Sequence, residues 1–143
     1  MIPGLENASY ARYGVMHRNT FLHSPGFLNA HFEMIARPQC YFAGQMTGVE
    51  GYMESAASGI LAGKNLARQL QGKPPLILPR ETMMGALAAY ISSAPTENFQ
   101  PMGANMGILP DLPERIRGKQ EKYQAYADRG MAALEQYLQT TEQ

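Results

Sequence analysis

The chain has 143 residues, enough for one domain with a hydrophobic core and too few for two domains of ordinary size. Its 12 basic and 12 acidic residues give a formal net charge of +0, which excludes the overall basic character of many nucleic-acid-binding proteins but permits a local basic face. One cysteine excludes an internal disulfide and favours a reducing compartment, so we expect a cytoplasmic protein. The first residues, MIPGLENASYARYG, show neither a signal-peptide pattern nor an apolar run of membrane-spanning length.

The first half of the chain contains three short segments with strand-like patterns, at residues 20–23, 31–35 and 40–44. The last of them is aromatic and ends at a glycine, which strengthens the prediction. Residues 50–70 are predicted as one helix, because apolar residues recur at helical intervals and Gly72 follows as a candidate C-cap. The apolar residues of this repeating face are Ala56, Ile60, Ala67 and Leu70.

The second half of the chain holds seven of the ten prolines, which separate a short apolar helix from a long amphipathic one. We predict the first helix over residues 81–92 and the second over residues 111–138, with an ordered loop at 97–110 between them. Gly118 and Gly130 each weaken the long helix by about 1 kcal/mol relative to alanine, so its ends or a bend are expected there. Together these elements predict an α/β fold whose carboxy-terminal part is mostly helical.

The stretch FAGQMTGVEGYMESAASGILAG, residues 42–63, places a glycine-rich turn between a predicted strand and a predicted helix. The first turn of a helix carries unpaired N–H groups and a partial positive charge, so it binds electron-rich groups. Gly44, Gly48 and Gly51 remove side chains that would keep a flat or anionic ligand away from those donors. Close packing without a ligand explains the same glycines, and the stretch lacks the GxGxxG fingerprint of dinucleotide-binding proteins. The spacing alone leaves both interpretations open.

Several long sequence motifs closely resemble motifs of one protein family and occur in the same order. They are RYGVMHRNTFLHSP, FAGQMTGVEGYMESAASGILAG, PRETMMGALAAYI and FQPMGANMGILP, and the resemblance covers essentially the whole chain. The chain resembles the carboxy-terminal third of the folate- and FAD-dependent tRNA (uracil-5-)-methyltransferases, the TrmFO or Gid family. GidA-type tRNA-modifying flavoproteins share the FAGQ stretch, whereas RYGVMHRN and FQPMGANMG favour the methyltransferases.

This resemblance implies a fragment of a glutathione-reductase-like FAD-binding fold. Residues 1–78 would belong to the FAD- and folate-binding α/β domain and residues 79–143 to a helical carboxy-terminal region. Family members bind FAD and transfer the methylene carbon of 5,10-methylenetetrahydrofolate, as a methyl group, to C5 of a uridine in the tRNA T loop. Their reducing equivalents come from NAD(P)H. The implied partners are tRNA and the missing amino-terminal part of the enzyme, with no membrane and no metal ion.

The resemblance also assigns one loop to the flavin ring and one motif to the folate. Within RYGVMHRN, it implies that His17 stacks on the pterin and that Arg18 holds the glutamyl carboxylates or a phosphate. Without the motif, His17 would be a surface histidine in an irregular segment. His23 and His31 lack such a motif and are expected to be structural or exposed. The residues implied near the flavin are Gly44, Gln45, Thr47, Gly48, Val49 and Glu50.

Cys40 invites the role of nucleophile at C6 of the uridine, because the family uses cysteines in this way. Those cysteines, however, lie upstream of the region that this chain resembles, and Cys40 precedes two aromatic residues in a predicted buried strand. We therefore expect Cys40 to be structural and the chain to hold no catalytic residue. We also expect the chain alone to bind FAD weakly or not at all, to lack methyltransferase activity and to self-associate through exposed strand edges.

Basic residues gather just before and at the start of the last predicted helix. Arg115, Arg117 and Lys119 form a candidate strip for tRNA phosphates, together with Arg80 and Lys122. Acidic residues interleave with them in the sequence, which is more typical of a solvated helix face. Two alternatives to a methyltransferase fragment stay open. They are a noncatalytic RNA-binding module and a fragment of a GidA-type flavoprotein. The interleaved acidic residues are Glu81, Asp111, Glu114 and Glu121.

Overall fold

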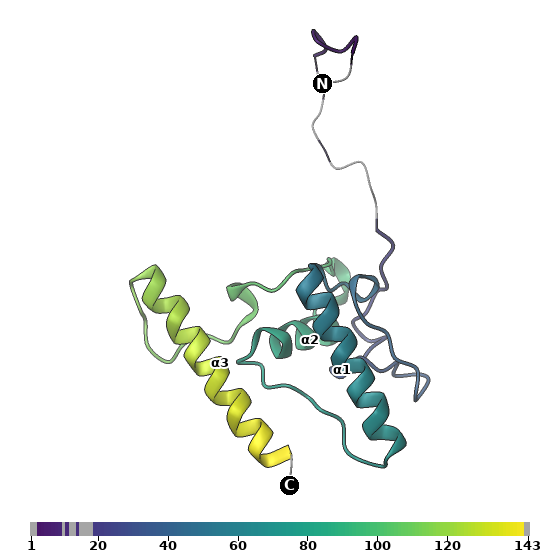
Figure 1. Cartoon of the computed structure of the whole chain (residues 1–143), viewed down its shortest axis with the longest axis vertical. Helices are drawn as coiled ribbons and strands as arrows, with labels where there is room; N and C mark the ends of the chain where they lie inside the picture. The colour runs from purple at the N-terminus through teal and green to yellow at the C-terminus, as the bar shows by residue number, and fades with distance from the viewer. Residues whose placement is uncertain (1–2, 10, 12–13, 15–18, 142–143) are drawn as a thin grey trace.

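The computed structural model describes residues 3–9, 11, 14 and 19–141 of the chain. Within them, the regular structure consists of three α-helices and three short 3-10 helices. The α-helices α1, α2 and α3 follow one another along the chain, and α2 lies between α1 and α3 (Figure 1). In chain order the elements are η1 (Gln45–Thr47), α1 (Tyr52–Leu70), α2 (Met83–Ser93), η2 (Thr96–Asn98), η3 (Met106–Ile108) and α3 (Lys119–Thr141).

The three predicted strands, at residues 20–23, 31–35 and 40–44, are wrong. Backbone pairing within the described part of the chain consists of isolated bridges, such as those joining Glu33 to Tyr41 and Val49 to Met102. Phe32 has a φ angle of 70°, so the chain turns inside the segment predicted as a strand at residues 31–35. Strand-like composition does not hold a segment extended when no neighbouring strand offers a continuous hydrogen-bond ladder.

α1 begins two residues later than predicted and ends at the predicted Leu70. Gly72 has a φ angle of 69°, and its N–H donates to the Gln69 carbonyl at 3.0 Å. The N–H of Lys73 donates to the Arg68 carbonyl at 2.9 Å. These two bonds form a Schellman motif, which confirms Gly72 as the glycine that ends the helix.

The side of α1 that faces the rest of the protein is small and polar rather than apolar. It carries the buried residues Ser58, Ala62 and Asn65. The side-chain amide of Asn65 donates to the Leu76 carbonyl at 3.1 Å, and its oxygen accepts from the Leu76 N–H at 2.6 Å. Asn65 thereby fixes the segment that leads from α1 to α2.

The repeating apolar face of α1 is exposed. We call its residues, Ala56, Ile60, Ala67 and Leu70, the apolar stripe. Ile60 is 62% exposed and Leu70 is 69% exposed. The pattern predicted the helix correctly, but the face that it marks does not contact the core of this chain.

α2 supplies much of the hydrophobic core. It begins at Met83, two residues later than predicted, after Thr82, whose hydroxyl accepts a hydrogen bond from the Gly85 N–H at 3.0 Å as an N-cap. Its buried side packs on α1 and on the segments before and after both helices. The core therefore joins residues on both sides of the boundary predicted after residue 78, and that division stays a prediction. The core residues are Phe32, Val49, Ala62, Leu87, Ala88, Ile91 and Phe99.

α3 is shorter at its start than predicted, because residues 111–118 are not helical. Pro113 has no N–H to donate within this segment. From α3, the two terminal nitrogens of Arg129 donate to the carbonyls of Pro110 and Asp111, at 2.6 and 2.8 Å. These bonds hold the beginning of the non-helical segment beside the helix, and the helix itself starts directly after Gly118.

Gly130 marks a close approach between α3 and the start of α2 rather than a break in α3. A Cβ atom at Gly130 would lie 3.0 Å from the carbonyl oxygen of Glu81. One turn earlier, Tyr126 is buried in a second small core cluster with Ala86 and Leu109. None of the helices in the described part of the chain combines the length and the apolar character that a membrane span requires.

Candidate functional site

The glycine-rich loop, residues 44–51, leads into α1 and has a fixed turn of its own (Figure 1). Gly44 and Gly48 flank η1 with φ angles of 74° and 87°. The N–H and the hydroxyl of Thr47 both donate to the Gly44 carbonyl, at 2.9 and 2.8 Å. Because L-residues with a side chain rarely adopt such φ angles, the two glycines are required by the shape of the turn.

Hydrogen bonds from two other segments hold the loop in place. The buried hydroxyl of Ser24 donates to the Thr47 carbonyl at 2.8 Å. The Gly44 N–H donates to the hydroxyl of Ser58 on α1, also at 2.8 Å, and that hydroxyl donates in turn to the Ser55 carbonyl at 2.7 Å. The loop is thus fixed to the segment before it and to the helix after it.

The segment around Phe99 closes the other side of the loop. The Met102 N–H donates to the Gly48 carbonyl at 2.8 Å, and a Cβ atom at Gly48 would lie 2.5 Å from Cζ of Phe99. The buried Phe99 ring also meets the rings of His23 and Tyr90, each at a centroid distance of 5.7 Å. Sequence reasoning missed Phe99, because a single aromatic residue in a loop without periodicity gives no local signal.

Gly51 precedes α1 as its N-cap residue, with a φ angle of 95° and no side-chain hydrogen bond to the helix. The carboxylate of Glu54 fills the space that a side chain at Gly51 would occupy, and it accepts a hydrogen bond from the Ala104 N–H at 3.2 Å. At Gly44, by contrast, a Cβ atom would meet only Ser55, at an ordinary contact distance of 3.7 Å or more. Contacts within the chain therefore account for Gly48 and Gly51, whereas at Gly44 the φ angle of 74° and not a steric overlap requires glycine.

The six residues assigned to the flavin ring lie in this one loop but differ in exposure. Thr47, Gly48 and Val49 are buried, and the side chains of Thr47 and Val49 face the protein. Gln45 and Glu50 are exposed. Next to them lie exposed apolar side chains at the start of α1, with Tyr52 98% and Met53 82% exposed. The accessible surface thus combines the uncapped N–H groups of a helix start with apolar side chains, which suits a flat, electron-rich ring.

The remaining residues singled out from the sequence do not join this loop in one site. His17 and Arg18 lie outside the described residues, so their folate assignment stays a prediction. Cys40 is partly buried, and its carbonyl accepts from the Met34 N–H at 2.7 Å. Across the described ranges, no group of three or more His, Cys, Asp or Glu side chains has the arrangement of a metal site.

Glu33 is the centre of a polar network that sequence reasoning missed. One carboxylate oxygen accepts from the Gln39 N–H at 2.9 Å and from the Gln69 side chain on α1 at 2.7 Å. The other lies 3.1 Å from Nε2 of His31 and accepts from Asn29 at 3.4 Å. These hydrogen bonds, above all the one from the Gln39 N–H, outweigh the effect of burial and lower the pKa of Glu33 from 4.5 to about 2. The network ties the turns before the loop to the end of α1.

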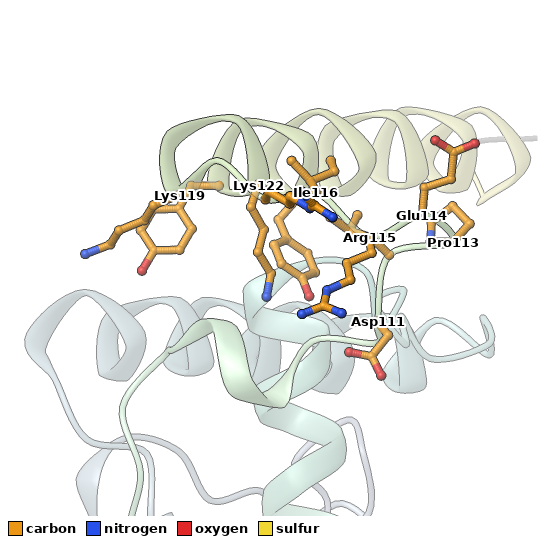
Figure 2. Close-up of a pocket in the computed structure, with 11 residues that line it drawn as sticks. Asp111, Pro113, Glu114, Arg115, Ile116, Lys119 and Lys122 are labelled. Carbon is orange, nitrogen blue, oxygen red and sulfur yellow. The ribbon is translucent and has the colours of Figure 1, made fainter.

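A second candidate site is a cavity of about 920 Å³ between residues 111–117 and the start of α3, which we call the basic cavity (Figure 2). It shares no residue with the glycine-rich loop. In Figure 2 the side chains of Arg115 and Lys122 point down and Lys119 points to the left. Asp111 points down on the same side as Arg115, and Glu114 points up. Its charged and aromatic lining residues are Asp111, Glu114, Arg115, Arg117, Lys119, Lys122, Tyr123 and Tyr126.

Comparison with known proteins identifies the family. The family model described as glucose inhibited division protein A matches residues 1–74, just over half of the chain. The chain belongs to the glucose-inhibited division protein A family.

The most similar relatives that we compared are tRNA (uracil-5-)-methyltransferases, in agreement with the sequence resemblance. The chain is 57% identical over 141 residues to the methylenetetrahydrofolate–tRNA-(uracil-5-)-methyltransferase TrmFO of Staphylococcus aureus strain Newman, and equally to those of strains N315 and MW2. Each match covers 98% of this chain and 32% of the relative. The resemblance to these methyltransferases is confirmed, and the chain spans about a third of the length of the curated relatives that it matches.

Proposed function

We propose that this chain forms the carboxy-terminal part of a tRNA (uracil-5-)-methyltransferase that uses FAD and 5,10-methylenetetrahydrofolate to convert a T-loop uridine to 5-methyluridine. The observation that carries the proposal is the 57% identity over 98% of the chain to relatives of that name. The match includes the glycine-rich loop, the segment that closes it and nearly all of α3. The reducing equivalents would come from NAD(P)H, and the reaction would take place in the cytoplasm.

The glycine-rich loop supports this proposal as one wall of a flavin site. A flavin bound there would supply the reduction that turns a methylene carbon into a methyl group. The start of α1 offers uncapped N–H groups and a partial positive charge, which stabilise a negative ring edge by about 0.3–2 kcal/mol. The exposed amide of Gln45 can donate a hydrogen bond to a polar atom of the flavin ring, while the exposed side chain of Met53 can cover an apolar part of that ring.

Burial defines what the other assigned residues contribute. Thr47 and Val49 are fully buried and support the loop from behind, and Gly48 leaves room for Phe99. These residues position the exposed edge and do not touch a ligand through their side chains. The α/β sheet of a flavoprotein, the ADP-binding motif and the nucleophile would then belong to the amino-terminal part of the enzyme.

One wall holds a cofactor weakly, so we expect the chain alone to bind FAD weakly or not at all and to have no methyltransferase activity. Gel filtration of the purified chain after incubation with FAD measures the first expectation. Protein fractions that stay yellow would contradict it, and they would show that the 143-residue chain forms more of the site than the loop.

A chimera tests the function itself. In the S. aureus methyltransferase, the 141 matching residues are replaced by those of this chain, and the purified protein is given unmodified tRNA, methylenetetrahydrofolate, FAD and NADPH. We expect 5-methyluridine in the T loop, detected by mass spectrometry of nuclease digests. A folded, FAD-containing chimera that forms none would refute the proposal. Modification of a different uridine at C5 would favour the GidA-type branch instead.

A further inference from the structure

We infer that the basic cavity docks an unpaired segment of RNA, with cations on its phosphates and a base stacked on Tyr123. The inference rests on the proposed function, because it names the place where the tRNA substrate would contact this chain. The cavity is separate from the glycine-rich loop, so it can be tested without flavin or folate.

None of the basic side chains that line the cavity forms an ion pair with a described carboxylate within 4.0 Å. The ion pair formed by His31 and Glu33 is the only one within 4.0 Å that the described residues contain. Acidic residues that interleave with Arg115 and Lys119 in the sequence therefore do not pair with them in space. Four basic residues and two acidic ones line the cavity, which leaves an excess of positive charge in an otherwise neutral protein. Such an excess attracts a phosphate backbone.

The two tyrosines of the cavity have different roles. Tyr126 is buried, and its ring centroid lies 5.8 Å from Nζ of Lys122 and 5.1 Å from the guanidinium carbon of Arg129. It therefore anchors the cavity. Tyr123 is 43% exposed, and Nζ of Lys119 lies 5.7 Å from its ring centroid. Lys119 lies over the Tyr123 ring, so a base would stack on the part of the ring that Lys119 leaves exposed while the cations contact its phosphates.

The combination of basic side chains and an exposed tyrosine ring favours an unpaired RNA segment over an RNA duplex. A duplex presents phosphates but keeps its base faces stacked inside, whereas loops and bulges offer both a phosphate and a free base face. The segment that forms one wall of the cavity begins at a fixed point, because Arg129 donates hydrogen bonds to the carbonyls of Pro110 and Asp111. This end of the wall does not have to be ordered on binding, so less conformational entropy is lost.

Fluorescence anisotropy of the 143-residue chain with a labelled T-arm stem–loop RNA tests the stacking part. A fully paired RNA duplex with the same number of phosphates is the comparison. We expect tighter binding of the stem–loop, and a loss of about 5- to 150-fold for Tyr123→Ala with the stem–loop alone, as for one stacked base. Tyr123→Phe should retain the affinity. Equal affinity for both RNAs, or no effect of Tyr123→Ala, would overturn the inference.

A salt series tests the phosphate part. The double variant Lys119→Gln/Lys122→Gln should lower the slope of log K against log salt by about 1.4–1.8, the change for two released phosphate contacts. The matched control, Lys64→Gln/Lys73→Gln, removes the same charge from exposed positions on and just after α1 and should leave the slope unchanged. Circular dichroism establishes that both variants are folded. Equal slopes for the two double variants would contradict docking at the cavity.

The same experiments separate this inference from the proposed function. If the chimera methylates tRNA while Lys119→Gln/Lys122→Gln binds RNA like the control, the docking site is wrong and the methyltransferase stands. If the chain binds the stem–loop as expected while the folded chimera never methylates, the docking site stands and the chain is an RNA-binding module.

Discussion

At the scale of single residues, the glycine-rich loop depends on what lies beside each glycine. Gly48 combines a φ angle of 87° with the ring of Phe99 directly against its missing side chain. A Cβ atom at Gly63, in the middle of α1, would meet no atom within 4 Å beyond its own helix. The two glycines look alike in the sequence, but only Gly48 is fixed by its surroundings.

Gly48→Ala should lower the free energy of unfolding by at least about 1–2 kcal/mol, the cost of the left-handed conformation for alanine. The overlap with Phe99 adds to this cost. Gly63→Ala is the matched control and should stabilise the chain by up to about 1 kcal/mol, because alanine is the better helix former. Urea denaturation measures both changes. A Gly48→Ala variant as stable as the unchanged chain would show that the loop shifts freely away from Phe99.

Glu33 makes the stability of the chain sensitive to acid. Its pKa falls from 4.5 to about 2 on folding, so its contribution is complete above pH 4.5 and is lost as the pH falls towards 2. We expect Glu33→Gln to be less stable than the unchanged chain above pH 4.5, and the difference to shrink towards pH 2. Urea denaturation across this pH range measures it. A difference that does not change with pH would exclude Glu33 as its source.

At the scale of elements, periodicity predicted the three α-helices but not their surroundings. The spacing of apolar residues located α1, and Gly72 located its end. The same spacing did not predict which face of α1 packs against the rest of the protein. Asn65 and Ser58 are buried there through hydrogen bonds with residues outside the helix. Residues 111–118 before α3 are not helical, and Arg129 bonds the carbonyls of Pro110 and Asp111, which is a tertiary contact that propensities do not contain.

Asn65→Leu should destabilise the chain by about 1–3 kcal/mol, because the N–H and the carbonyl of Leu76 would lose their partner in a partly buried place. Lys64→Leu, one residue earlier and exposed, is the control and should have little effect. Urea denaturation gives the free energies, and hydrogen exchange at the Leu76 amide reports the local change. Unchanged protection of that amide would contradict the role given to Asn65.

At the scale of the whole molecule, contacts between distant residues decide both the core and the candidate site. The predicted strands failed because each depends on a partner, and the turns around Phe32 follow hydrogen bonds that local composition does not reveal. Phe99 and Gly48 lie 51 residues apart in the sequence, and Glu33 and Gln69 lie 36 apart. The loop itself was predicted from its glycines, but the identity of its neighbours was not.

Self-association was expected through strand edges, and the structure offers the apolar stripe of α1 instead. Ile60→Lys/Leu70→Lys should shift the chain towards monomer, because burial of these exposed side chains would drive the contact. Met131→Lys, at an exposed apolar position on α3, is the control and should leave the association unchanged. Sedimentation velocity over a range of concentrations measures it. An unchanged chain that is monomeric at every concentration would contradict the prediction.

The closure of the glycine-rich loop by residues 99–104 also bears on the order of events during synthesis. α1 and its Schellman motif use residues within about two turns of one another, so they can form while the chain is still being translated. The loop acquires Phe99, Met102 and Ala104 as neighbours only after this later segment has left the ribosome. The glycine-rich loop is therefore completed late, after the helix that it introduces.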